Sequence, residues 1–138
     1  MKFMMIVKAT KKSEAGVMPD EKLLSAMMKY NEELSKAGVL LDLAGLHPTS
    51  KGARIRYSGD KATVIDGPFA ETRELIAGYW LIQVKSRQEA IDWAKRIPNP
   101  YGEEGEVEVR QLFELDDFEP SESIEKAREI EKDLSKKR

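Results

Sequence analysis

The chain contains no cysteine, which excludes disulfide bonds, thiol nucleophiles and thiolate metal sites. This absence also suits a reducing compartment, so we expect a cytoplasmic protein. Long hydrophobic runs are missing too. The apolar run that opens the chain, Phe3 to Val7, is too short for a signal-peptide core or a membrane span. We therefore expect a protein that is neither exported nor embedded in a membrane.

An excess of either charge is absent as well. Lys and Arg total 23 against 25 for Asp and Glu, which gives no general attraction to phosphate backbones, so we expect no nucleic-acid partner. The sequence also lacks the residue spacings typical of zinc and calcium ligands, phosphate-binding loops, dinucleotide fingerprints and serine-nucleophile turns. We accordingly predict no cofactor and no metal.

The residues that are present fit one soluble domain. A chain of 138 residues with 41% hydrophobic content can build an ordinary core. Apolar periodicity predicts strands at residues 3–8, 39–46, 53–57, 62–66, 78–84 and 106–113, and helices at 20–37 and 86–97. Asp20 is the expected N-cap of the first helix and Gly38 its stop, while Ser86 and Glu89 form a capping-box signature for the second.

From residue 116 onward the composition becomes strongly charged. A narrow apolar stripe of Ile124, Ala127, Ile130 and Leu134 recurs there at helical spacing. We predict a domain at residues 1–115 followed by a helical extension at 116–138. The extension either packs against a partner subunit or remains a solvated tail.

The order of elements predicts an α+β fold of the ferredoxin-like type. Right-handed crossovers place both main helices on one face of a four-stranded antiparallel sheet. The strands at 3–8 and 78–84 are apolar on both faces, so a monomer would leave a hydrophobic sheet face exposed. We predict a homodimer in which two such faces pair. The hairpin at residues 52–66 is additional to this order and forms either a pocket wall or an arm toward the other subunit.

The most distinctive stretch is Asp66-Gly67-Pro68-Phe69-Ala70-Glu71-Thr72-Arg73-Glu74. Proline fixes its own φ and disfavours helical backbone at Gly67, so Asp66 is held at a defined strand exit. This stretch resembles the signature of the YCII-related family with the D-G-P-F motif, and residues 1–4, 37–40, 45–48, 78–82 and 90–94 are similar to that family too. The resemblance spans about residues 1 to 115 and implies a dimeric α+β barrel. It also implies a family whose members mostly lack an established reaction.

Asp66 and His47 are the candidate catalytic residues. Shorter relatives in the family are thought to be enzymes that use a histidine and an aspartate, and the resemblance implies this pair here. His47 is the only histidine, and an imidazole with a reference pKa near ~6.5 can act as acid or base at neutral pH. The alternatives are a surface role for His47 and a turn-stabilising role for Asp66, whose carboxylate would accept a backbone N–H from residues 67 to 69.

Gly67, Pro68, Phe69, Arg54 and Arg73 are the candidate substrate-binding residues. Arg54 shares a strand face with Arg56, and a guanidinium group can bind a carboxylate or phosphate through two hydrogen bonds. A solvated hairpin face is the alternative for the arginine pair. Arg73 follows the motif closely enough to reach back toward it, with surface ion pairing as its alternative.

These residues lead to three functional hypotheses. The first is a small dimeric enzyme in which Asp66, with His47, performs acid–base chemistry on a small polar metabolite. The second is a non-catalytic ligand-binding or regulatory module; similarity to family members encoded beside alternative sigma factors implies a link to transcription. The third is a structural accessory dimer without a ligand.

Overall fold

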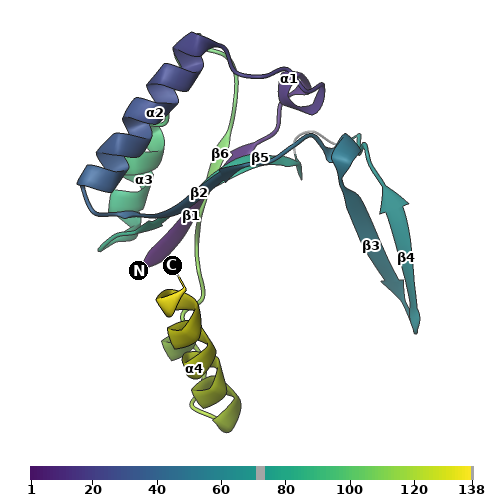
Figure 1. Cartoon of the computed structure of the whole chain (residues 1–138), viewed down its shortest axis with the longest axis vertical. Helices are drawn as coiled ribbons and strands as arrows, with labels where there is room; N and C mark the ends of the chain where they lie inside the picture. The colour runs from purple at the N-terminus through teal and green to yellow at the C-terminus, as the bar shows by residue number, and fades with distance from the viewer. Residues whose placement is uncertain (71–73, 138) are drawn as a thin grey trace.

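A four-stranded antiparallel sheet forms the body of the protein. The computed structural model describes residues 1–70 and 74–137. The strands β1 (Lys2–Lys8), β2 (Leu40–Gly45), β5 (Ile76–Gln83) and β6 (Val107–Gln111) lie in the order β2-β5-β1-β6. The helices α2 (Glu21–Lys36) and α3 (Arg87–Lys95) lie side by side on one face of this sheet (Figure 1). This arrangement confirms the predicted α+β class and the ferredoxin-like order.

Local sequence signals set the ends of both helices. The Asp20 carboxylate accepts a hydrogen bond from the Leu23 N–H at 3.0 Å, and Gly38 has a φ of 73° that favours glycine after the last turn of α2. The Ser86 hydroxyl accepts from the Glu89 N–H at 3.1 Å. The Glu89 carboxylate accepts from the N–H of Lys85, not of Ser86, at 3.0 Å. In the usual capping box this carboxylate accepts from the N–H of the N-cap residue, whereas here it accepts from the residue before the N-cap.

The core lies between the sheet and the two helices. The Tyr30 ring packs edge-on against Trp80 with ring centroids 5.4 Å apart, and its buried hydroxyl donates to the Trp93 carbonyl at 2.6 Å. The Trp80 indole N–H donates to the Asn31 side-chain oxygen at 2.7 Å, so the polar atom of this large side chain is satisfied. The other buried members of the core are Phe3, Met5, Leu34, Val39, Ile82, Val84 and Ala90.

The opposite sheet face, which we call the open face, is not covered by α2 or α3. Strand alternation places Met4, Ile6, Tyr79 and Leu81 on it, and Glu108 pairs there with Ile6 across β6. Met4, Tyr79 and Leu81 are only half-buried. The Tyr79 hydroxyl lies 3.3 Å from the Asp42 carboxylate, whose charge raises the pKa of Tyr79. The open face is therefore apolar at its centre with polar groups at its edges.

A separate two-stranded hairpin extends away from the body (Figure 1). It consists of β3 (Ala53–Ser58) and β4 (Lys61–Asp66), joined by a turn in which Gly59 has a φ of 58°. Two short helices lie between the predicted strands and helices: α1 (Lys11–Glu14) and the 3₁₀ turn η1 (Thr49–Lys51). Sequence periodicity cannot detect elements this short, because they contain about one helical turn.

The chain ends in α4 (Glu122–Lys136), where the charged extension with its apolar stripe predicts a helix. The Ser121 hydroxyl caps α4 by accepting from the Ile124 N–H at 3.2 Å. The helix packs mainly against the preceding 3₁₀ turn η3 (Leu115–Asp117), and Arg128 pairs with Asp116 at 2.8 Å. Among the described residues, none of the helices has the length and apolar composition needed to cross a membrane.

Candidate functional site

The D-G-P-F turn (residues 66–69) leads the chain out of the hairpin and back toward the body. The Gly67 N–H donates to the Gly52 carbonyl at 2.9 Å, which continues the pairing of β3 and β4. The Phe69 N–H donates to the Thr49 hydroxyl at 3.0 Å. Pro68 has no N–H to donate. The N–H groups of residues 67 to 69 are thus engaged by the segment around η1, and none of them is free to hold the Asp66 carboxylate.

Close packing makes glycine necessary at position 67. A Cβ atom built there would lie 1.7 Å from the Thr49 carbonyl oxygen and 2.6 Å from its carbon. Both atoms belong to the backbone, so no side-chain movement can make room. The glycine of the motif is therefore explained by the contact between the turn and η1.

Glu14 fixes the other side of Thr49. Its carboxylate accepts from the Thr49 N–H at 3.1 Å and from the Thr49 hydroxyl at 2.5 Å. The hydroxyl that donates to Glu14 accepts from Phe69, so one threonine connects α1 to the D-G-P-F turn. Charge-assisted hydrogen bonds of this kind hold a geometry more strongly than neutral ones.

Sequence reasoning missed both Glu14 and Thr49. The one local signal in this region is the capping box of α1. The Thr10 hydroxyl accepts from the Ser13 N–H at 3.2 Å, and the Ser13 hydroxyl accepts from the Thr10 N–H at 2.8 Å. That signal could have predicted a helical turn but not its partner. The contact between Glu14 and Thr49 spans 35 residues, and spacing alone carries no information about it.

Asp66 is the last residue of β4 and is exposed to solvent. It pairs with Ala53 across the hairpin. Within the described residues, its carboxylate accepts no hydrogen bond from a side chain or from the turn. The structure thus fixes the backbone on both sides of Asp66 while its carboxylate stays accessible.

His47 lies in the loop between β2 and η1, and it is also exposed. The Leu46 N–H donates to the Ala77 carbonyl at 2.8 Å, and the carbonyl of Pro48, the N-cap of η1, accepts from the Lys51 N–H at 3.0 Å, so the backbone on both sides of the histidine is held. Thr49, which contacts the D-G-P-F turn, follows two residues later. His47 and Asp66 therefore flank the same junction, but in the described part of the chain no hydrogen bond or ion pair joins them.

Arg54 stacks on the phenylalanine of the motif. Its guanidinium carbon lies 3.9 Å from the centroid of the Phe69 ring, which is a cation–π contact. Arg54 pairs with Ile65 across the hairpin, whereas Asp66 pairs with Ala53, so strand alternation places Arg54 and Asp66 on opposite faces. Arg73 lies outside the described residues, so its predicted role stays a prediction.

One surface depression of the described residues lies elsewhere. It has a volume of about 510 Å³ and is open to solvent. All of its lining residues belong to the outer surface of α2: Glu21, Leu24, Ser25, Met28, Lys29 and Glu32. Within residues 1–70 and 74–137, His, Asp and Glu side chains do not gather into a group that could hold a metal ion.

Comparison with known proteins places these features in a family. The model of the YCII-related domain matches residues 1–116 of the chain. An uncharacterized protein of Rhizobium meliloti (strain 1021), R00369, is 38% identical over 93 residues, which cover 67% of this chain and 75% of that protein. The matched residues include the sheet, both main helices and the D-G-P-F turn, and they end before α4.

Proposed function

The chain belongs to the YCII-related family, and from this premise we propose that it is a homodimer that binds a small polar metabolite beside the D-G-P-F turn. Asp66 acts there as the acid–base group, assisted by His47. Gly67, Pro68 and Phe69 form one wall, which Arg54 supports by stacking on Phe69 from the hairpin face opposite Asp66. Arg73 contributes the positive charge that attracts an anionic group.

The main support for the proposal is that hydrogen bonds hold the backbone of the D-G-P-F turn while the Asp66 carboxylate stays accessible. Gly67 and Phe69 donate their N–H groups to Gly52 and Thr49, and Thr49 is in turn bound by Glu14. A carboxylate that served only to stabilise the turn would accept one of these N–H groups. A general acid or base needs the opposite arrangement, with a fixed backbone and a side chain that can reach a substrate proton.

The open face supports the homodimer. Its central side chains, Met4, Tyr79 and Leu81, are apolar or aromatic and half-buried in the single chain. Pairing with the same face of a second copy would remove them from water and form the barrel that the family resemblance implies. We also propose a cytoplasmic location, because a chain without cysteine suits a reducing compartment.

A second function is favoured by the exposure of the candidate pair. Asp66 and His47 are both open to solvent in the single chain, and acid–base catalysis is most effective where water is excluded. A non-catalytic ligand-binding or regulatory module, linked to transcription, needs no such exclusion. Binding without turnover would favour this second function.

The experiment is a thermal-shift screen of small carboxylates, phosphates and amino compounds against the wild type, Asp66→Asn and His47→Gln. A ligand of the folded state raises the melting temperature by mass action. Asp60→Asn is the matched control, because Asp60 is also exposed but lies in the turn at the far end of the hairpin. Any compound that binds is then followed by NMR for chemical change.

We expect a shift that Asp66→Asn reduces and Asp60→Asn leaves intact, followed by turnover that Asp66→Asn abolishes. A shift that is unchanged in Asp66→Asn would remove Asp66 from the site. A shift in melting temperature that depends on Asp66 but is not followed by turnover would favour the non-catalytic binding module over the enzyme.

The homodimer is tested separately by sedimentation. Leu81→Lys places a charge at the centre of the open face, and we expect it to give monomers. Leu24→Lys is the control, because Leu24 is an exposed leucine on the outer surface of α2. A wild type that sediments as a monomer would contradict the proposed dimer.

A further inference from the structure

The hairpin at residues 53–66, which we call the arm, stands away from the rest of the molecule (Figure 1). Every residue of the arm is exposed except Ile65, which is half-buried. Its two strands pack extensively on each other and on no other helix or strand of the described chain. A two-stranded hairpin without further support is at best marginally stable in water, so the arm requires a surface to pack against.

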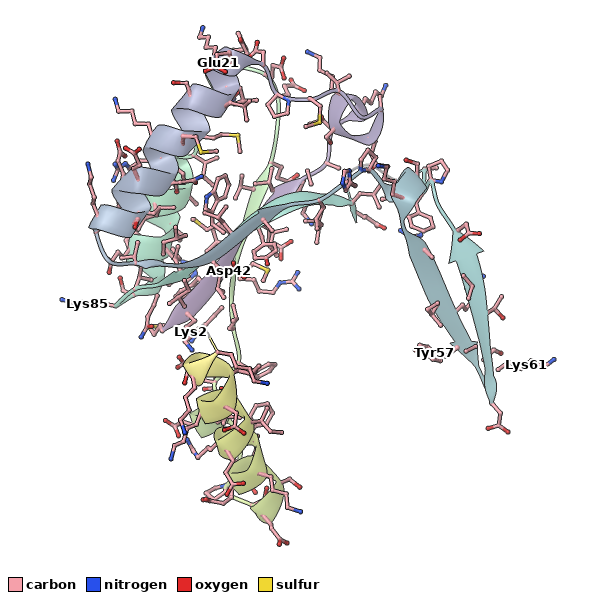
Figure 2. The ribbon with its side chains drawn as sticks, in the orientation of Figure 1. Lys2, Glu21, Asp42, Tyr57, Lys61 and Lys85 are labelled. Carbon is pink, nitrogen blue, oxygen red and sulfur yellow. The ribbon has the colours of Figure 1, made fainter. Side chains whose placement is uncertain are left out.

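The arm has one apolar face and one basic face. Ile55 pairs with Val64 and Tyr57 with Ala62 on the apolar face. Tyr57 is 78% exposed, Val64 63% and Ile55 47%. The side chains of Tyr57 and Lys61 leave the arm in opposite directions, with Tyr57 on the side nearer the body (Figure 2). An apolar face this accessible is typical of a protein contact surface.

The basic face carries Arg54, Arg56 and Lys61. Arg54 and Arg56 pair with Ile65 and Thr63, and Lys61 pairs with Ser58, so all three basic side chains share one side of the arm. Long basic side chains can bend around the edges of a narrow ribbon and reach charges beside the surface on which its apolar face packs.

The same chain carries a surface that complements the arm. The acidic segment, residues 113–122, contains Glu114, Asp116, Asp117, Glu119 and Glu122 and no lysine or arginine. It also exposes two aromatic rings, since Phe113 is 81% exposed and Phe118 46%. The two ring centroids lie 5.4 Å apart, so they form one apolar patch surrounded by negative charge.

We propose that the arm of one subunit packs on the acidic segment of a second copy of this chain. The apolar face of the arm covers Phe113 and Phe118, while Arg56 and Lys61 reach the surrounding carboxylates. In a two-fold dimer the contact occurs twice, once for each arm. This inference rests on the proposed homodimer and adds to it a specific contact between subunits.

Charge complementarity favours a second copy of this chain as the binding partner of the arm. The arm and the acidic segment of a single chain are far apart in the fold (Figure 1), and β3 and β4 make no extensive contact with η3 or α4. Within one chain, therefore, the arm does not neutralise the acidic segment: Asp116 pairs with Arg128, and the exposed rings of Phe113 and Phe118 lie against each other. Asp66 lies at the base of the apolar face, at the opposite end of the arm from Tyr57.

The test uses the absence of cysteine, because an introduced thiol is then the only one in the chain. A tagged Tyr57→Cys chain is mixed with an untagged Phe118→Cys chain, subunits are exchanged, and a short flexible bismaleimide is added. We expect a covalent tagged–untagged pair as the main product. Ser25→Cys in place of Tyr57→Cys is the control, since Ser25 lies on the outer surface of α2.

A second variant measures the contribution of the arm to assembly. The double substitution Ile55→Ser with Val64→Ser removes two apolar side chains from the contact, and we expect the dimer dissociation constant to rise by roughly a hundredfold. Ser58→Ala with Thr63→Ala, on the basic face, is the matched control and should leave the constant nearly unchanged.

The outcomes separate the two proposals. A stable dimer that cross-links no better than the Ser25→Cys control would overturn the arm contact and leave the homodimer standing. A monomeric wild type would overturn both. Cross-linking of a Tyr57→Cys and Phe118→Cys double variant within single chains, with none between chains, would also overturn the arm contact.

Discussion

Substituting the motif glycine, Gly67→Ala, tests the contact that fixes the D-G-P-F turn. The added Cβ would lie 1.7 Å from the Thr49 carbonyl oxygen, so the turn must move away by more than ~1 Å. That movement breaks the hydrogen bonds from Gly67 to Gly52 and from Phe69 to Thr49, which are 2.9 and 3.0 Å long. The contact between Arg54 and Phe69 is lost with them.

The expected loss follows from these contacts. Two hydrogen bonds contribute about 1 kcal/mol each, and an exposed cation–π contact contributes about 0.5 to 1 kcal/mol. Because alanine has fewer backbone conformations than glycine in the unfolded chain, the substitution also recovers about 0.4 to 1 kcal/mol of the lost free energy of unfolding. We expect Gly67→Ala to lower the free energy of unfolding by about 1.5 to 2.5 kcal/mol.

The neighbouring glycine provides the control. Gly52 has extended backbone, with a φ of −115°, and a Cβ there would meet the Thr49 oxygen at an ordinary 3.6 Å. Gly52→Ala should therefore leave the protein equally stable or stabilise it by up to about 1 kcal/mol, because only the unfolded state is affected. The two substitutions make the same chemical change at adjacent points of the hairpin base, but only Gly67→Ala should lower the free energy of unfolding.

Urea denaturation measures the free energy of unfolding, and amide hydrogen exchange locates the change. If the arm detaches without global unfolding, the Phe69 N–H should lose protection by about tenfold or more, while core amides keep theirs. A Gly67→Ala protein that is as stable as Gly52→Ala and keeps the Phe69 amide protected would refute the argument from close packing.

Four further predictions concern the body and the last helix. Tyr30→Phe should cost about 1 to 2 kcal/mol in urea denaturation, because the Trp93 carbonyl loses its buried donor; an unchanged midpoint would contradict this. Burial raises the pKa of the Tyr30 hydroxyl above its usual 10, so stability should be complete below pH 10 and fall as the pH rises further; a curve flat from pH 9 to 12 would show that this shift is absent. Tyr101→Phe should raise the pKa of the Asp20 carboxyl toward its usual value, because the Tyr101 hydroxyl is the main cause of its lowering; carboxyl ¹³C titration checks this, and no change would exclude that hydrogen bond. Removal of residues 120–138 should leave urea unfolding of the monomer within about 1 kcal/mol, because α4 packs mainly on η3, and a larger loss would place α4 in the core.

Local signals made the helices and strands of the body predictable. Asp20 and Ser86 cap the helices where the sequence places them, and Gly38 adopts the positive φ that ends α2. Strand alternation predicted that β1 and β5 have two apolar faces, and the structure covers one of them with helices. These features depend on neighbours within a few residues, which is why a single sequence contains them.

The candidate site was only partly predictable. The motif predicts Asp66 and the single imidazole predicts His47; in the structure Asp66 precedes Gly67, and His47 lies two residues before Thr49, which Gly67 approaches. The opposite placement of Arg54 and Asp66 depends on the register of the hairpin, which pairs Ala53 with Asp66. A shift of one residue in that register would reverse which side chains share a face. The sequence contains the two strands but leaves this register open.

The sequence by itself determined the order of elements, the ends of the two main helices and the presence of a glycine–proline turn after β4, because each depends on short-range backbone preferences. Only the tertiary structure decided that Gly67 must approach the Thr49 carbonyl and that Glu14 must bind Thr49. These residues lie far apart along the chain and meet only after the sheet has formed and the hairpin base has closed on η1. Their contacts are set by packing, and packing has no counterpart in the spacing of residues along a single chain.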